Sequence, residues 1–123
     1  MIKNIIVADR CTGKTRHLIQ KCSQDEYSLI VCPNHMMCNY TFKEAESMGV
    51  KIPMPITFED FVMGKFSPRN VNKFYFDELG ISLSGMANGI PIDTVIIGFE
   101  TDSKLYAVGP SVNRKEKLEG LND

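Results

Sequence analysis

The sequence predicts an α/β fold of three layers, with helices on both faces of a mostly parallel sheet. Three observations support this prediction. Apolar runs alternate along the chain with segments of helical period. The first apolar run leads into a Gly-Lys-Thr sequence at the start of such a segment, and a later run ends in two acids. Both features put polar side chains at the carboxyl ends of strands, where open α/β sheets bind their ligands.

The regular elements follow from the spacing of apolar residues. Short apolar runs predict strands at residues 2–8, 27–32, 71–76, 93–99 and 105–108. Apolar positions at helical spacing predict helices at residues 13–22 and 36–48. The residues expected to face inward from these helices are Leu18, Ile19, Cys22, Phe42, Ala45 and Met48.

Residues 51–56 are expected to be extended and to lie at a sheet edge, because Pro53 and Pro55 have no N–H to donate to a ladder. Thr57 has the character of a helix N-cap. The apolar face of the short helix that follows is expected to hold Phe58, Phe61 and Val62. We expect residues 1–108 to form one domain and residues 109–123 to form a charged tail.

Composition excludes several classes of protein. The length of 123 residues fits one domain, and the net charge of -1 gives no global attraction to nucleic acid or anionic membrane. No apolar run approaches the roughly 20 residues that cross a bilayer, and the start resembles a strand more than a signal peptide. We therefore expect a cytoplasmic protein with no membrane partner. Cys11, Cys22, Cys32 and Cys38 form no C-x-x-C pair, which predicts free thiols.

Residues 8–15 match the pattern G-x-x-x-x-G-K-[ST], with alanine in place of the first glycine. A strand before the loop and an amphipathic helix after it give the context that a phosphate-binding loop requires. Backbone N–H groups of such a loop point at the β-phosphate, and the helix adds the positive end of its dipole. The predicted nucleotide contacts are Ala8, Asp9, Arg10, Cys11, Thr12, Gly13, Lys14, Thr15 and Arg16.

Individual residues of this loop have separate expected roles. Gly13 allows the backbone to approach the phosphate closely. Lys14 is expected to reach the β- and γ-phosphates as a point charge and to act in catalysis, and the Thr15 hydroxyl is expected to ligate Mg²⁺. Arg10 has three readings that the sequence does not separate: a phosphate contact, a contact with a neighbouring subunit, or a solvated loop side chain.

The strand predicted at residues 71–76 ends in Asp77 and Glu78. An acid at such a strand end holds Mg²⁺ in enzymes with a phosphate-binding loop, and a second acid beside it polarises the attacking water. This interpretation assigns Asp77 to the metal and Glu78 to general-base catalysis. The competing interpretation is a helix N-terminus, where acids favour the dipole.

Several segments resemble the first motor domain of superfamily 1 DNA helicases, over residues 2–106. Residues 13–19, which read GKTRHLI, are similar to the first motif of that family, G-K-T-R-x-L. Residues 29–34 are similar in placement to the next motif, which touches single-stranded DNA. Residues 56–61 resemble T-F-H-S-F, with Glu59 and Asp60 in place of His and Ser. The resemblance implies a P-loop NTPase fold, ATP and Mg²⁺ as cofactors, and single-stranded nucleic acid as a candidate partner.

The chain also departs from that family. Phe99 stands where the third motif has aspartate, and the glutamine that senses the γ-phosphate is missing or replaced near Asp102 and Ser103. We expect neither an upstream glutamine for adenine nor a second motor domain, and we therefore expect a stand-alone first half of the kind that a compact phage or other viral genome encodes. The expected function is therefore slow Mg²⁺-dependent ATP hydrolysis in a DNA or RNA transaction, completed by a protein partner or by self-assembly.

Two other functions stay open at this stage. The first is a binding or inhibitor module that keeps the P-loop fold and regulates a partner protein without turnover. The second is a nucleoside kinase, because residues 86–89 and 94–98 after the acidic pair are similar to thymidine kinases; the zinc-binding cysteines of that family are absent from the sequence. The sequence does not separate ATP from GTP, although the lack of an N-K-x-D pattern favours ATP. Lys65, Arg69 and Lys73 form either a solvated face or a nucleic-acid contact.

Overall fold

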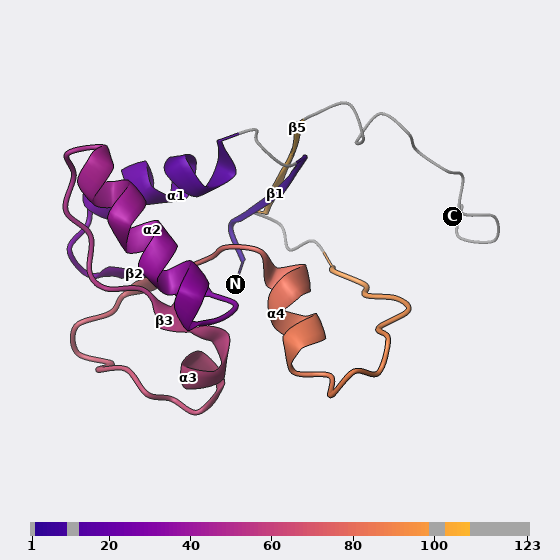
Figure 1. Ribbon diagram of the computed structural model, residues 1–123. Helices are drawn as coiled ribbons and strands as arrows, with labels where there is room; N and C mark the ends of the chain where they lie inside the picture. Colours follow the sequence, from indigo (N-terminus) through magenta and orange to yellow (C-terminus); the bar gives the residue numbers. More distant parts are fainter. Residues whose placement is uncertain (1, 10–12, 99–102, 109–123) are drawn as a thin grey trace. The chain divides into compact units, whose positions relative to one another are not determined.

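The computed structural model describes residues 2–9, 13–98 and 103–108 (Figure 1). This part of the chain is mixed α/β, and every strand pair in it is parallel. The chain divides into two compact units, which are described separately below. The larger unit is Lys14–Val95, and the smaller unit combines Met1–Gly13 with Ile96–Asp123.

The larger unit is built on a three-stranded sheet in the order β3-β2-β4. Its strands are β2 (Ser28–Cys32), β3 (Ile56–Thr57) and β4 (Lys73–Phe76). Every residue of the central strand β2 is buried, as a continuous apolar run predicts for a strand covered on both faces. β3 is a two-residue strand at the sheet edge, which confirms the edge position expected from the prolines before it.

One face of this sheet is covered by α1 (Lys14–Ser23) and α2 (His35–Ser47), which lie side by side in Figure 1. Both helices were expected, within one or two residues at each end. The buried cluster on this side consists of Ile19, Cys22, Ile30, Cys32, Cys38, Ala45 and Ile52, with Leu18, Phe42, Met48 and Tyr75 packed against it. The Asn34 side chain caps α2 by accepting a hydrogen bond from the Met37 N–H at 2.9 Å.

The alternate side chains of β4 belong to an aromatic cluster with the short helix α3 (Phe58–Val62). Its members are Phe58, Phe61, Phe66, Phe74 and Phe76. The Phe61 ring meets the Phe76 ring edge-on at a centroid distance of 4.7 Å, an arrangement that aromatic pairs favour. Thr57 caps α3 as expected, since its hydroxyl oxygen accepts the Asp60 N–H at 3.0 Å. Val62, expected to face inward, is 59% exposed.

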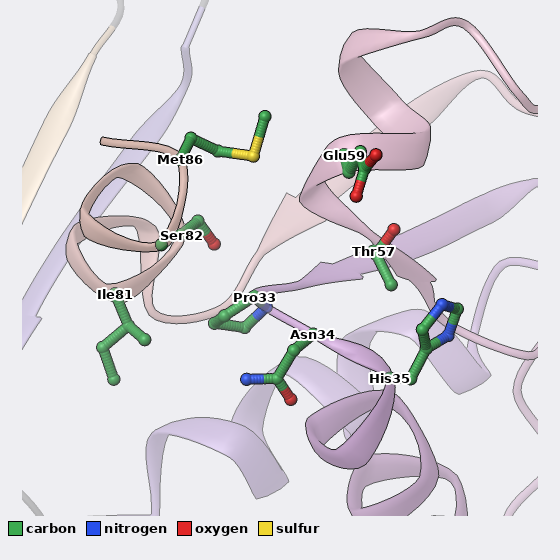
Figure 2. Close-up of a pocket in the computed structure, with 9 residues that line it drawn as sticks. Pro33, Asn34, His35, Thr57, Glu59, Ile81, Ser82 and Met86 are labelled. Atoms are coloured by element: carbon green, nitrogen blue, oxygen red, sulfur yellow. The ribbon is translucent and has the colours of Figure 1, made fainter. Parts of the chain in front are cut away.

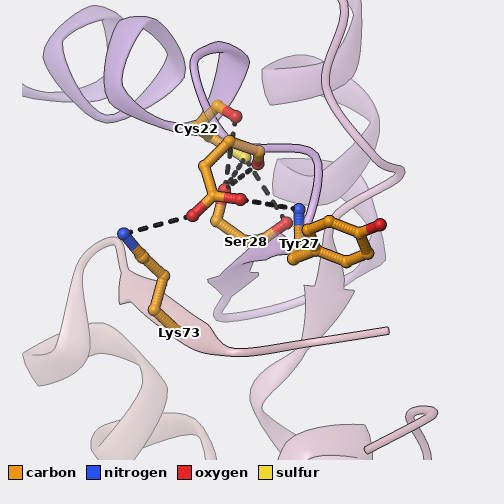
Figure 3. Close-up of polar contacts among 5 residues, drawn as sticks. Cys22, Tyr27, Ser28 and Lys73 are labelled. Carbon is orange, nitrogen blue, oxygen red and sulfur yellow. Dashed lines mark hydrogen bonds and ion pairs between the residues drawn. The ribbon is translucent and has the colours of Figure 1, made fainter. Parts of the chain in front are cut away.

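A polar cluster ties the end of α1 to the start of β4 (Figure 3). One Asp25 carboxylate oxygen accepts the Tyr27 N–H at 2.9 Å, and the other lies 3.1 Å from the Lys73 ammonium. The hydrogen bond from the Tyr27 N–H is the larger cause of a lowered pKa of Asp25, and the Lys73 contact lowers this pKa further. The Ser28 hydroxyl beside them lies within hydrogen-bond distance of the Cys22 and Asp25 carbonyl oxygens. Lys73, one of the three expected basic residues, is therefore paired within the chain.

The region after β4 differs from the sequence prediction. Leu79–Gly85 forms a helix, α4, that was not predicted. The strand expected at residues 93–99 is wrong for residues 93–98, which carry no regular secondary structure, and Phe99 lies outside the described residues. Its β-branched residues are strand formers, but strand propensity acts only where a neighbouring strand supplies hydrogen bonds and packing. Ile96 is instead 88% exposed.

The smaller unit contains two parallel strands, β1 (Asn4–Ala8) and β5 (Lys104–Val108). Their register pairs Ile6 with Tyr106. Both strands were expected from their apolar runs. The predicted tail, residues 109–123, lies outside the described residues. Among the described helices, none has both the length and the apolar character to cross a membrane.

We predict that Cys22, Cys32 and Cys38 stay unmodified when the native chain is treated with iodoacetamide at neutral pH. All three are buried free thiols. Burial raises the pKa of Cys32 to about 12 and also raises the pKa of Cys22 and of Cys38, so little reactive thiolate forms. Peptide mapping by mass spectrometry measures the labelling, with the denatured chain as the fully reactive control. Rapid native labelling of any of the three would contradict this packing.

Candidate functional site

Two sequence motifs that are far apart along the chain meet in the larger unit. α1 begins at Lys14, and Asp77 directly follows the last residue of β4. The Thr15 hydroxyl donates a hydrogen bond to Asp77 Oδ2 at 2.9 Å. The Lys14 Nζ atom lies 2.5 Å from Glu78 Oε1. The structure therefore brings together the four residues to which the sequence assigned metal and catalytic roles.

Asp77 is positioned by the sheet. Its backbone N–H donates to the Val31 carbonyl oxygen at 3.0 Å, which continues the pairing of β4 with β2 by one residue. The residue is only 4% exposed. Burial raises the pKa of the Asp77 carboxyl, the nearby Glu78 charge raises it further, and the Thr15 hydrogen bond and the Lys14 charge act in the opposite direction.

Glu78 has an unusual backbone conformation, with φ of 58° and ψ of 54°. This left-handed region is rarely used by residues other than glycine and asparagine, and it costs on the order of 1 kcal/mol or more. The turn directs the chain from β4 into α4, whose Ser82 N–H donates to the Glu78 carbonyl oxygen at 3.0 Å. Backbone strain of this kind concentrates at functional sites, where the surrounding structure maintains it.

Only some of the remaining residues of the predicted phosphate loop lie in the described part of the chain. Ala8 ends β1 and Asp9 follows it in the smaller unit, whereas Arg10, Cys11 and Thr12 lie outside the described residues. Gly13 has φ of 81°, a conformation that glycine adopts without steric cost. The backbone conformation favours glycine at this position, whereas space does not limit the side chain, because an added Cβ would meet no atom within 4 Å.

Arg16, a predicted nucleotide contact, is engaged with α2. Its Nε atom lies 2.6 Å from Glu44 Oε1, and the Arg16 side chain is 62% exposed. This ion pair joins α1 to α2 near the predicted site. Glu44 carried no signal in the sequence, because an acid on the polar side of a helix is ordinary.

The oxygen atoms of Thr15 and Asp77 fit a magnesium ion that arrives with a phosphate. Mg²⁺ prefers oxygen ligands, and in nucleotide enzymes it is held by one or two protein groups together with phosphate oxygens. A hydroxyl and a carboxylate 2.9 Å apart supply that kind of donor set. Within the described residues, no three His, Cys, Asp or Glu side chains gather into a metal site made by protein alone.

A pocket of about 260 Å³ in the larger unit was not anticipated from the sequence (Figure 2). It is lined by Pro33, Asn34, His35, Thr57, Glu59, Ile81, Ser82, Gly85 and Met86. These residues come from the β2–α2 junction, the start of α3 and one side of α4. The sequence contained no signal for this pocket, because its lining residues are brought together only by the fold.

Comparison of the chain with models of protein families, with curated proteins and with solved structures found no match. The resemblance to helicases therefore stays a prediction from short motifs. The geometry of the four residues at the ends of α1 and β4 stands independently of it.

We predict that Asp77→Asn makes the metal-free chain more stable than wild type at neutral pH. The folded-state pKa of Asp77 is raised above its ordinary value of 3.8, so its favourable contribution is complete below pH 3.8 and is lost as the pH rises through the folded pKa. Asparagine keeps an acceptor for Thr15 and carries no charge. The stability difference between the variant and wild type should therefore grow as the pH rises.

Urea unfolding in EDTA at a series of pH values measures this difference. Glu46→Gln, which neutralises an exposed acid on α2, is the matched control and should show a much smaller dependence on pH. The same pH dependence in both variants would show that burial of Asp77 is not the cause.

Proposed function

We propose that this chain is a P-loop ATP-binding protein with slow Mg²⁺-dependent ATPase activity that serves a DNA or RNA transaction. The observation that carries the proposal is the pairing of Lys14 with Glu78 and of Thr15 with Asp77. A cation and a hydroxyl at a helix start, facing two acids at a strand end, form the donor and acceptor set that phosphoryl transfer requires.

Each of the four residues has a defined task in this proposal. Lys14 exchanges the Glu78 carboxylate for the β- and γ-phosphate oxygens of the nucleotide. Thr15 and Asp77 hold Mg²⁺, which when bound neutralises phosphate charge. Glu78, released from Lys14, accepts a proton from the attacking water. Glu78 is 25% exposed, so water reaches it without a rearrangement of the core.

The proposal includes a specific fold, the three-layer P-loop NTPase fold, with the nucleotide at the carboxyl ends of the strands. Support comes from β2, whose five residues are all buried, and from the different clusters on the two sides of β4. The choice of ATP, and a role with nucleic acid, rest on the sequence motifs alone.

Hydrolysis is expected to be slow in the isolated chain. The sequence offers no clear glutamine that senses the γ-phosphate, and an arginine supplied by a second protein is worth orders of magnitude in rate. A partner protein or a second copy of this chain would complete the site.

We predict that Lys14→Ala weakens binding of Mg²⁺–ATP at least about 10-fold, since the variant loses the cation that faces the phosphates. Calorimetric titration of ATP and of ADP measures the affinity. Lys43→Ala, which removes an exposed lysine from α2, is the control and should bind as wild type does. If the folded wild type binds neither nucleotide, the proposal fails for the isolated chain.

We predict that Glu78→Gln abolishes turnover while it tightens ATP binding by about 2- to 5-fold. The variant has no general base, and Lys14 no longer has a charged competitor for phosphate. An ion pair whose two side chains are each 25% exposed contributes about 1 kcal/mol. Phosphate release and calorimetry on the same preparation separate the two effects. Weakened binding with unchanged turnover would contradict both roles of Glu78.

A further inference from the structure

The pocket beside α4 contains a buried polar group that has no partner. Ser82 is 2% exposed, and its Oγ atom forms no hydrogen bond in the structure. Figure 2 shows this hydroxyl directed from α4 toward the space beside Pro33. An unsatisfied buried hydroxyl destabilises a fold, so a ligand that bonds to it removes an existing cost.

The pocket combines apolar and polar surfaces. Pro33, Ile81 and Met86 supply apolar contacts, and methionine adapts its shape to varied partners. Gly85 stands one turn after Ser82 on α4 and also lines the pocket; a Cβ added there would meet nothing within 4 Å. The missing side chain leaves room for a ligand group to approach the helix.

Charge selects against an anionic ligand. Of the lining residues in the described part of the chain, Glu59 is the only acid, and none is lysine or arginine. Asp60 follows Glu59 in the first turn of α3. The α2 N-terminus at Asn34 contributes the positive end of a helix dipole, but that end is equivalent to roughly half a charge, less than the full charge of Glu59.

The surroundings indicate a partner larger than a small molecule. Each element that lines the pocket also exposes a large apolar side chain: Met36 on α2 is 75% exposed, Val62 on α3 is 59% exposed, and Met86 after α4 is 47% exposed. Exposed apolar side chains on the elements that line a pocket are typical of protein-binding surfaces.

We propose that this pocket binds a peptide segment of a partner protein, in which an apolar side chain is flanked by lysine or arginine. The apolar side chain contacts Pro33, Ile81 and Met86. A backbone amide of the segment bonds to the Ser82 hydroxyl, and the flanking cation pairs with Glu59. This site has its own lining residues, and the proposal stands whether or not the chain binds ATP.

The test is a titration of the full chain, followed by ¹⁵N–¹H spectra. The probes are acetylated tripeptide amides with leucine, methionine or phenylalanine between two lysines, and the matched peptides have glutamates in place of the lysines. The lysine peptides should shift the amide signals of Ser82 and Gly85 saturably, with affinity at least about 5-fold higher than the glutamate peptides. No saturable shift at these amides, or equal binding of both peptide sets, overturns the proposal.

Variants of α4 separate the site from a general surface effect. Ser82→Ala should weaken peptide binding about 5-fold, the effect of one hydrogen bond, and should raise the unfolding temperature because the unsatisfied hydroxyl is gone. Gly85→Leu should abolish binding by filling the pocket. Ser84→Ala, an exposed position on the same helix, should bind as wild type does. Unchanged affinity in Ser82→Ala overturns the proposal, as does a single-stranded oligonucleotide that shifts these amides when the peptides do not.

Discussion

The parallel pairing of β4 with β2 is the constraint on which the candidate site depends. β4 places Phe74 and Phe76 in the aromatic cluster and Tyr75 against the other buried cluster, so a one-residue slip against β2 would move these side chains to the wrong faces. That register ends with the hydrogen bond from the Asp77 N–H to Val31. The position of the acidic pair is therefore set by the most buried part of the sheet.

The candidate site combines two features that oppose folding with two contacts that offset part of their cost. Asp77 is buried with a raised pKa, and Glu78 adopts a left-handed conformation; both features oppose folding. The contacts of Asp77 with Thr15 and of Glu78 with Lys14 offset part of this cost. If a phosphate and a metal ion replace those contacts, as proposed above, their binding would add to the stability of the folded chain.

Much of the fold could be predicted because local physical signals were strong. α1 and α2 have clear apolar periodicity, and the two prolines before β3 correctly indicated an edge. α4 was missed because its sequence, Leu79–Gly85, contains two glycines and no charged residue, so its intrinsic helix propensity is low. The strand expected at residues 93–99 is wrong for residues 93–98 for the opposite reason, because β-branched residues form a strand only where a neighbouring strand pairs with them.

The candidate site was predictable in part for the same reason. Lys14, Thr15, Asp77 and Glu78 stand in motifs for which phosphate chemistry was expected, and the structure places these four residues together. The contact of Arg16 could not be predicted from the sequence. Its partner Glu44 lies on another helix, and no local sequence pattern indicates such a contact. The pocket around Ser82 depends on three elements at once, so only a tertiary structure could reveal it.

The two proposed sites share α4 as a structural element. Glu78 stands immediately before the helix, and its carbonyl oxygen accepts the N–H of Ser82 one turn later. A nucleotide that draws Lys14 away from Glu78 would change the contacts of the residue whose carbonyl oxygen closes the first turn of α4. A peptide bonded to the Ser82 hydroxyl would change the contacts of the residue whose N–H closes the same turn. If both ligands bind and this turn responds to each of them, thermodynamic linkage requires that each change the affinity of the other by the same factor. The short helix that the sequence did not predict is then the element through which the nucleotide state and the partner are coupled.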